Sequence, residues 1–350
     1  MLGQEQKDIL ESAFQRGLKL HDQSIMECLE NLEVSSYENL ANLAILGLPL
    51  DFNGIKCLFE LSGVVLSDDD LLAWIVIFLE MNLFHKIAFT DDNTVLWRLK
   101  DEVCAYFSKY FKSEDLKKYH LNADRFILEQ LASLAANNGI ILPDDETRRE
   151  SIIGPNNFLD HIAHLPQHQE FHQVILNLAI NWFDHLFWLE EYKEAADILN
   201  HICFALARRG QRKMAENMLA TVASKTKGLT TIVAQINLAT LLREEQQISA
   251  AMQLYWRTIP KLLGQKAYVQ LAQVLSEIAA IHRQRGHLVQ SAIILEISVM
   301  LNTWLKNGKS AAIAHSQLAS TFRYLKIYPL ALRNSRLAVD HFRKTYDLLN

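Results

Sequence analysis

The chain has 350 residues, enough for two or three domains, and its 50% of apolar residues can form hydrophobic cores. Its longest apolar run, Leu71 to Leu79, is less than half of the length needed to span a membrane. Four cysteines without the spacing of a metal knuckle, and an N-terminus without a signal peptide, favour a cytoplasmic protein with reduced thiols. The net charge of -5 is unevenly distributed: residues 1–200 carry 15 Lys and Arg against 33 Asp and Glu, a charge of -18, whereas residues 201–350 carry 20 against 7, a charge of +13.

Apolar residues at helical spacing over residues 4–33 predict one bent helix or two, so we expect an N-terminal helical segment over residues 1–34. A further helix is predicted over 37–48, because Ser35 offers a start for it and Pro49 ends it. We expect this helix to be the first of the following domain.

Between residues 50 and 111 the pattern changes from helical to strand-like and back. Short helices are predicted over 52–61 and 71–83, strands over 85–89 and 94–99, and a last helix from Asp101. The segment between the strands, Thr-Asp-Asp-Asn, has the composition of a turn, so the strands are predicted to form a β-hairpin. Helix, helix, helix, hairpin and helix is the order of a winged helix.

Two stretches of this region carry a resemblance. They are Leu-Ala-Ile-Leu-Gly-Leu-Pro-Leu, which begins at Leu43, and Leu-Trp-Arg-Leu-Lys-Asp-Glu-Val-Cys-Ala-Tyr-Phe, which begins at Leu96. They resemble the winged-helix module that follows the nucleotide-binding domain in STAND-class signalling ATPases, although the family's His-Asp pair is Lys100-Asp101 here. The resemblance implies a winged-helix-like domain over residues 35–115. The sequence has no Gly-x-x-x-x-Gly-Lys-Ser/Thr phosphate loop, so it lacks the ATPase domain that precedes this module in the family. We therefore expect either a fragment of a longer receptor or a stand-alone protein that has only the part of the receptor after the ATPase domain.

A winged helix raises the question of DNA binding, and the charge of this module argues against it. The helix that would enter the major groove begins with three Asp residues, and no basic residue occurs from Leu58 to His85. Affinity for duplex DNA comes mainly from Lys and Arg at the phosphates. We therefore favour a protein-docking or packing role for the module.

Residues 116–170 are predicted to be a helical connector and hinge, because Gly, Pro, Asn and Asp punctuate its second half. Four histidines lie near its end: His161, His164, His168 and His172. Imidazoles at three- and four-residue spacing can share a metal on one helix face, with Asp160 or Glu170 completing the set. Because Pro166 breaks the helix between the two pairs, we favour solvated histidines and expect neither a metal nor a cofactor.

From about Leu229 the sequence repeats itself at a spacing of forty residues. The recurring positions are Leu238-Ala239, Ile278-Ala279 and Leu318-Ala319; Arg243, Arg283 and Arg323; and Ala251, Ser291 and Ala331. Each unit has the pattern of two helices, which is typical of an α-solenoid. The small-residue pattern resembles the tetratricopeptide repeat (TPR), and the long period resembles the sensor solenoids of STAND-class proteins. We expect a mainly α fold in which a TPR-like solenoid occupies residues 171–350.

The repeated arginines define a candidate binding site. Arg243 lies about 40° around its helix from Ala239, on the side that lines the concave groove in the TPR family. Arginine makes charge-assisted, often bidentate contacts with carboxylates and phosphates. The predicted ligand-binding residues are Arg243, Arg283, Arg323, Asn237, Gln284 and Tyr324. The alternative is structural, because each Arg is in the last turn of its helix, where a cation favours the helix dipole and can cap carbonyls.

We therefore predict a protein-interaction module, a sensor or adaptor in signalling, that binds an acidic peptide or protein segment in the basic groove. The acidic half of the same chain, or of a head-to-tail copy, is a candidate occupant; two independently solvated surfaces are the alternative. A second possible function is nucleic-acid binding along the basic solenoid, which steep salt dependence would reveal. We do not expect an enzyme, because the sequence shows no phosphate loop, nucleophile elbow, metal set or convergent carboxylate pair.

Overall fold

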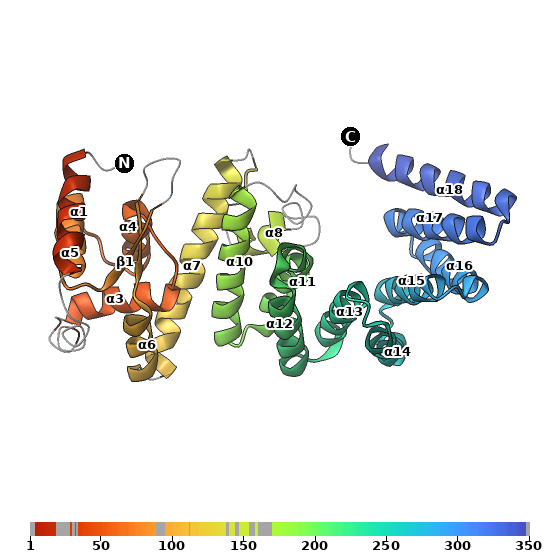
Figure 1. Cartoon of the computed structure of the whole chain (residues 1–350), viewed down its shortest axis with the longest axis horizontal. Coiled ribbons are helices and arrows are strands. Elements are labelled where there is room, and N and C mark those ends of the chain that lie inside the picture. The colour runs from red at the N-terminus through yellow and green to blue at the C-terminus, as the bar shows by residue number, and fades with distance from the viewer. Residues whose placement is uncertain are drawn as a thin grey trace. The chain divides into compact units, whose positions relative to one another are not determined.

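The computed structural model describes residues 4–18, 29, 32, 34–88, 95–111, 113–137, 140–143, 147–153, 158–159 and 170–347. These residues are mainly helical and include one two-stranded sheet, as the sequence predicted (Figure 1). The chain divides into two compact units, residues 1–195 and residues 196–350. Among the described residues, none of the helices is both long enough and apolar enough to cross a bilayer.

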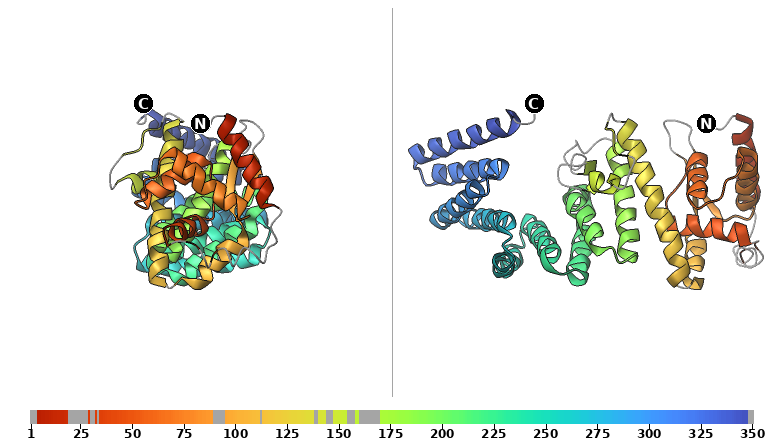
Figure 2. Two further views of the ribbon diagram at one scale, coloured as in Figure 1. Left: turned by 90° about the vertical axis from the view of Figure 1, so that its left-hand side faces the viewer. Right: turned by 180° about the vertical axis from the view of Figure 1, so that it is seen from behind.

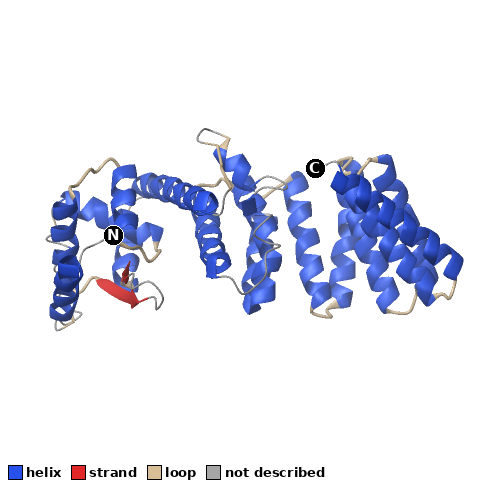
Figure 3. Ribbon diagram, turned by 90° about the horizontal axis from the view of Figure 1, so that it is seen from above, coloured by secondary structure: helices blue, strands red, loops and turns tan. Residues whose placement is uncertain are grey.

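The first unit contains the hairpin, which is red in Figure 3. Its elements are α1 (Gln4–Gly17), α3 (Val34–Leu46), α4 (Phe52–Leu61), α5 (Asp68–Glu80), β1 (Phe84–Ala88), β2 (Val95–Leu99), α6 (Asp101–Tyr110), α7 (Ser113–Asn137), α8 (Arg148–Ile153), α10 (Glu170–Trp188) and the beginning of α11 (Tyr192–Leu206). The long helix α7, yellow in Figure 2, packs against α3, α4 and α10.

The two strands pair antiparallel, with Phe84 opposite Leu99. The backbone of Trp97 also exchanges two hydrogen bonds with that of Leu50, at 2.9 and 2.8 Å, so the residues before α4 join the edge of the hairpin. The predicted turn between the strands, residues 90–93, lies outside the described residues. The order α3, α4, α5, hairpin, α6 confirms the predicted secondary structure of this region.

Local hydrogen bonds explain where the helices of this unit begin and end. Helix α5 begins after Ser67, whose hydroxyl accepts a hydrogen bond from the backbone N–H of Asp70 at 3.2 Å. The prediction that α3 runs to Leu48, where Pro49 would end it, was wrong by two residues. The helix ends at Leu46 because Gly47 takes a positive φ of 65° and its N–H donates to a carbonyl one turn back.

A buried carboxylate ties α7 to α8 and α10. Asp124 on α7 accepts a hydrogen bond from the indole N–H of Trp182 at 2.7 Å and another from Arg149 at 2.6 Å. Arg149 also donates to Glu191, at 2.6 Å, so one guanidinium bridges two carboxylates. Burial raises the pKa of Asp124, and the charge of Arg149 opposes this shift. The sequence did not predict this network, because its members are distant in the chain.

Two histidines form a second polar contact between α7 and α10. Nδ1 of His120 lies 2.8 Å from Nδ1 of His185, and Nε2 of His185 lies 3.0 Å from Oδ1 of Asn181. The Asn181 amide N–H donates to the carbonyl of Leu46, so its oxygen must accept from His185. Neutral His185 then accepts at Nδ1, and His120 is the donor. Burial lowers the pKa of His120 to about 4 and that of His185 to about 3, and the His120 ring stacks on Trp188.

The predicted histidine cluster cannot be placed. His161, His164 and His168 lie outside the described residues, and so does the side chain of His172. Within the described part of the chain, no group of three or more His, Cys, Asp or Glu side chains has a metal-binding arrangement.

The second unit is an array of antiparallel helices. Its elements after α11 are the π-helical turn η1 (Ala207–Gln211), α12 (Arg212–Lys225), α13 (Gly228–Glu244), α14 (Ile248–Gly264), α15 (Tyr268–Gln284), α16 (Leu288–Trp304), α17 (Gly308–Tyr324) and α18 (Tyr328–Asp347). We call α13, α15 and α17 the A helices and α14, α16 and α18 the B helices. Consecutive A helices start forty residues apart, which confirms the predicted repeat. The A helices also contact one another directly.

Every turn between these helices contains one residue in the left-handed region. Between A and B helices these residues are Gln246, Gly286 and Lys326, and between B and A helices they are Lys266 and Lys306. Their N–H groups donate to carbonyls three residues earlier, which ends each helix. The sequence analysis located the first set of turns from the breaks in the repeat, whereas it did not locate the second set.

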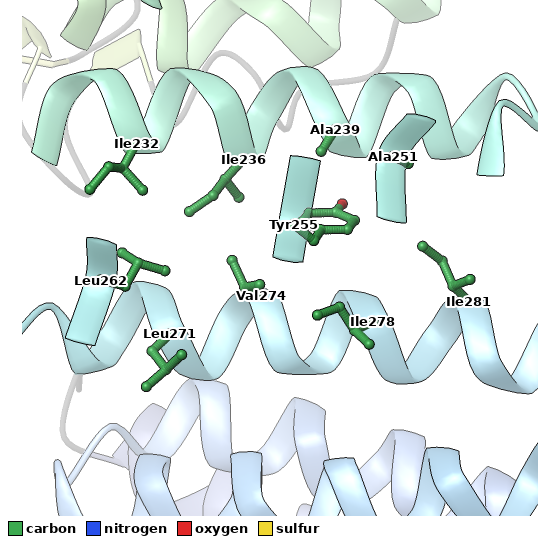
Figure 4. Close-up of a cluster of buried hydrophobic side chains, with 10 residues drawn as sticks. All are labelled: Ile232, Ile236, Ala239, Ala251, Tyr255, Leu262, Leu271, Val274, Ile278 and Ile281. Atoms are coloured by element: carbon green, nitrogen blue, oxygen red, sulfur yellow. The ribbon is translucent and has the colours of Figure 1, made fainter. Parts of the chain in front are cut away.

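The core of this array lies between A and B helices. Figure 4 shows the cluster around Tyr255, which is fully buried. Its members are Ile232, Ile236 and Ala239 of α13, Ala251, Tyr255 and Leu262 of α14, and Leu271, Val274, Ile278 and Ile281 of α15. The small repeated residues Ala239 and Ala279 are also fully buried, which agrees with the predicted close approach of a facing helix.

Candidate interaction surface

The A helices bring the repeated arginines into one row. Each of Arg243, Arg283 and Arg323 lies in the last turn of its A helix. Nε of Arg243 lies 2.9 Å from Oε2 of Glu277 on the next A helix. Arg283 donates a hydrogen bond of 3.3 Å to the backbone carbonyl of Gln317, again on the next A helix. Two of the three arginines therefore connect consecutive repeats.

The contact of Arg243 with Glu277 is mostly shielded from water. The side chains are 19% and 21% exposed, so water screens their attraction only in part. Burial raises the pKa of Glu277, whereas the charge of Arg243 lowers it. Next to this pair, the hydroxyl groups of Tyr255 and Thr240 share a hydrogen bond of 2.8 Å. The pair thus belongs to the polar edge of the core between α13, α14 and α15.

The six predicted ligand-binding residues fall into two groups. Asn237 is 6% exposed and donates to Oδ1 of Asn200 at 2.8 Å, so it lies inside the array together with the contacts of Arg243 and Arg283. Gln284, Arg323 and Tyr324 lie at the surface. The guanidinium carbon of Arg323 is 5.7 Å from the ring centre of Tyr324, which is 59% exposed. The accessible part of the predicted site is therefore smaller than the sequence suggested.

The structure adds a surface that the sequence analysis did not select. Five apolar side chains of α16 are exposed: Val289, Ile293, Ile297, Met300 and Trp304. They are spaced by three or four residues and share one helix face. This spacing was visible in the sequence, but inside a repeat it is normally the signal of a core face, so exposure could not be inferred from it.

No protein-family model and no curated protein sequence matches this chain. Three solved structures illustrate what it is similar to. A kinesin light chain from Podosopora anserina with nearly identical TPR-like repeats is 14% identical, with 54% of this chain and 95% of that chain covered and a TM-score of 0.42. BtubC from P. vanneervenii is 11% identical, with 66% and 92% covered and a TM-score of 0.45. A STAND protein with a tetratricopeptide repeat sensor from Pyrococcus horikoshii is 13% identical, with 94% and 54% covered and a TM-score of 0.28.

The structural class of this protein is assigned from its own helices. Helix pairs recur every forty residues, small residues lie where helices approach, and A helices pack on A helices. The second unit is a TPR-like α-solenoid. Repeat arrays of this class present extended concave surfaces.

Proposed function

We propose that the A-helix surface of the second unit binds an acidic segment of a partner protein. The observation that carries this proposal is the exposed pair of Arg323 and Tyr324, which places a guanidinium beside an aromatic ring. A carboxylate can take two parallel hydrogen bonds from such a guanidinium, and the ring can pack against the ligand's backbone or side chains. Gln284, exposed on the preceding A helix, adds a hydrogen-bond donor. The charge of +13 over residues 201–350 attracts acidic ligands.

In this proposal the other predicted residues have a supporting role. Arg243, Arg283 and Asn237 hold neighbouring repeats in register, and their positions determine the spacing of the surface groups. The three arginines therefore have different proposed roles. Arg323 makes direct ligand contacts, whereas Arg243 acts through the packing of α13 against α15.

We also propose a role for the first unit. In the proposed organisation, residues 1–34 precede a winged-helix-like module over residues 35–115, and residues 116–170 connect it to a solenoid that begins at 171, so that the first repeat helices belong to the first compact unit. The acidic first half competes for the basic surface, either within one molecule or from a head-to-tail copy. In this view the protein is a cytoplasmic sensor or adaptor that exchanges an internal acidic ligand for an external one.

The test is capture of binding partners from lysate, with and without nuclease treatment, by the full chain and two variants. Arg323→Glu reverses the charge at the proposed site, and Arg333→Glu makes the same change at an exposed position on α18. We expect a protein that is retained by the unaltered chain and by Arg333→Glu but lost by Arg323→Glu. Equal capture by all three would contradict the proposed site, and capture that disappears with nuclease would favour nucleic-acid binding.

A further inference from the structure

Helix α16 exposes an apolar stripe, of which Trp304 also touches the array through an edge-to-face contact with Tyr268 of α15 at 5.6 Å. The exposed fractions are 57% for Val289, 56% for Ile293, 45% for Ile297, 71% for Met300 and 68% for Trp304. The stripe runs over 16 residues, from Val289 to Trp304, which corresponds to about 22 Å of helix. A contiguous exposed apolar surface is uncommon on a protein that does not bind anything there.

The opposite side of α16 already supplies the packing that the array needs. Ser291, Ala292, Leu295, Ser298 and Asn302 are all buried. Ser298 donates to the carbonyl of Ala272 on α15 at 2.9 Å. The helix therefore has an inner face with its own packing partners and an outer apolar stripe in addition, so the stripe does not contribute to the core of the array.

The stripe is also not a by-product of the repeat. The equivalent positions of α14, forty residues earlier, are Ser249, Gln253, Arg257, Pro260 and Gly264. Those of α18, forty residues later, are Pro329, Arg333, Leu337, Asp340 and Lys344. Apolar side chains occupy all five positions only in α16, so the stripe is a property of this one helix.

Its spacing indicates the shape of the occupant. From Ile293 the exposed residues follow at intervals of four, three and four, which is the alternation of a coiled-coil seam. A seam of this width matches one partner helix with the same alternation, whereas a broad face would suit a sheet or a larger core. The occupant is thus an amphipathic helix.

The charged residues around the stripe indicate which kind of partner helix can bind to it. The only charged residue of α16 is Glu296, while exposed basic residues flank both ends of the stripe: Arg285 before it, and Lys306 and Lys309 after it. A second copy of α16 would bring basic ends onto basic ends, whether it lay parallel or antiparallel. A helix with acidic residues at both ends complements the same pattern.

We propose that the α16 stripe is a second docking surface, separate from the A-helix site, and that it binds one amphipathic helix of a partner protein with an apolar seam and acidic ends. The seam supplies the buried apolar contact, with Met300 and Trp304 as its most exposed members. Arg285, Lys306 and Lys309 select the charge of the partner helix. The stripe lies on a B helix, so an acidic segment on the A helices and a helix on α16 use different side chains.

The experiment measures binding of two synthetic helices to the full chain by fluorescence anisotropy. Each is about 20 residues long, with Leu at alternating four- and three-residue spacing. One carries Glu pairs at both ends and the other Lys pairs. We expect the Glu-ended helix to bind at least about tenfold more tightly than the Lys-ended helix.

Variants assign the binding to the stripe. Ile297→Gln is expected to weaken binding of the Glu-ended helix about tenfold, because it places a polar amide in the middle of the seam. Ile313→Gln is the matched control, since Ile313 of α17 is 44% exposed and lies outside the stripe. Equal binding of both helices, binding of neither, or equal loss in both variants would overturn the proposal. Self-association of the unaltered chain that Ile297→Gln abolishes would also overturn it, in favour of a second copy.

Discussion

Replacing Arg243 by Met separates the structural from the ligand-binding interpretation of the arginine row. The change keeps most of the apolar length of the side chain but leaves Glu277 in a site where its side chain is 21% exposed. Breaking a fully buried pair costs about 3 to 5 kcal/mol. Because this pair is partly exposed, we expect a loss of about 2 kcal/mol in the free energy of unfolding.

The loss can be measured by urea unfolding monitored by circular dichroism. Arg323→Met is the matched control, since Arg323 holds the equivalent position in its repeat and is exposed. We expect this control to change the free energy of unfolding by less than about 0.5 kcal/mol. In the double variant Arg243→Met, Glu277→Met, stability should recover in part, because no uncompensated carboxylate remains. If Arg243→Met and Arg323→Met lose the same amount, the reasoning about the repeat contact is refuted.

Three further predictions concern the packing of each unit. Because burial lowers the pKa of His120 and His185, these two side chains bind more protons in the unfolded chain than in the folded one below pH 6.5, so their contribution to the free energy of unfolding should be complete at pH 7 and decrease by about 2 kcal/mol toward pH 4; in urea unfolding, His120→Gln should flatten this part of the pH dependence. Gly17→Ala should destabilise the first unit, because a Cβ there would lie 1.8 Å from a backbone oxygen of α5, and a thermal melt that is unchanged would contradict this contact. Tyr255→Phe should lower the free energy of unfolding by about 1 kcal/mol through the lost hydroxyl contact, whereas the surface change Tyr324→Phe should leave it unaltered.

The local pattern of the sequence determined most of the secondary structure. The forty-residue spacing of small residues predicted the A and B helices, because each such residue must lie where two helices approach. Three Asp residues before Leu71 indicated the acidic start of α5, because first-turn carboxylates act over a single helical turn, and the structure adds the cap by Ser67. Interactions between residues within one or two helical turns can be predicted from a single sequence, and so can the net charges of the two halves of the chain.

The partners of individual side chains depend on contacts between distant residues, and only the tertiary structure decided these. The sequence placed Arg243, Arg283 and Arg323 in one row, but it could not show that the first two contact the next repeat while the third is exposed. Likewise, the spacing of apolar residues on α16 shows only that they share a face, and the structure shows that the array buries the other side of that helix. Periodicity determines which residues share a face, but the packing of neighbouring helices determines which face meets water.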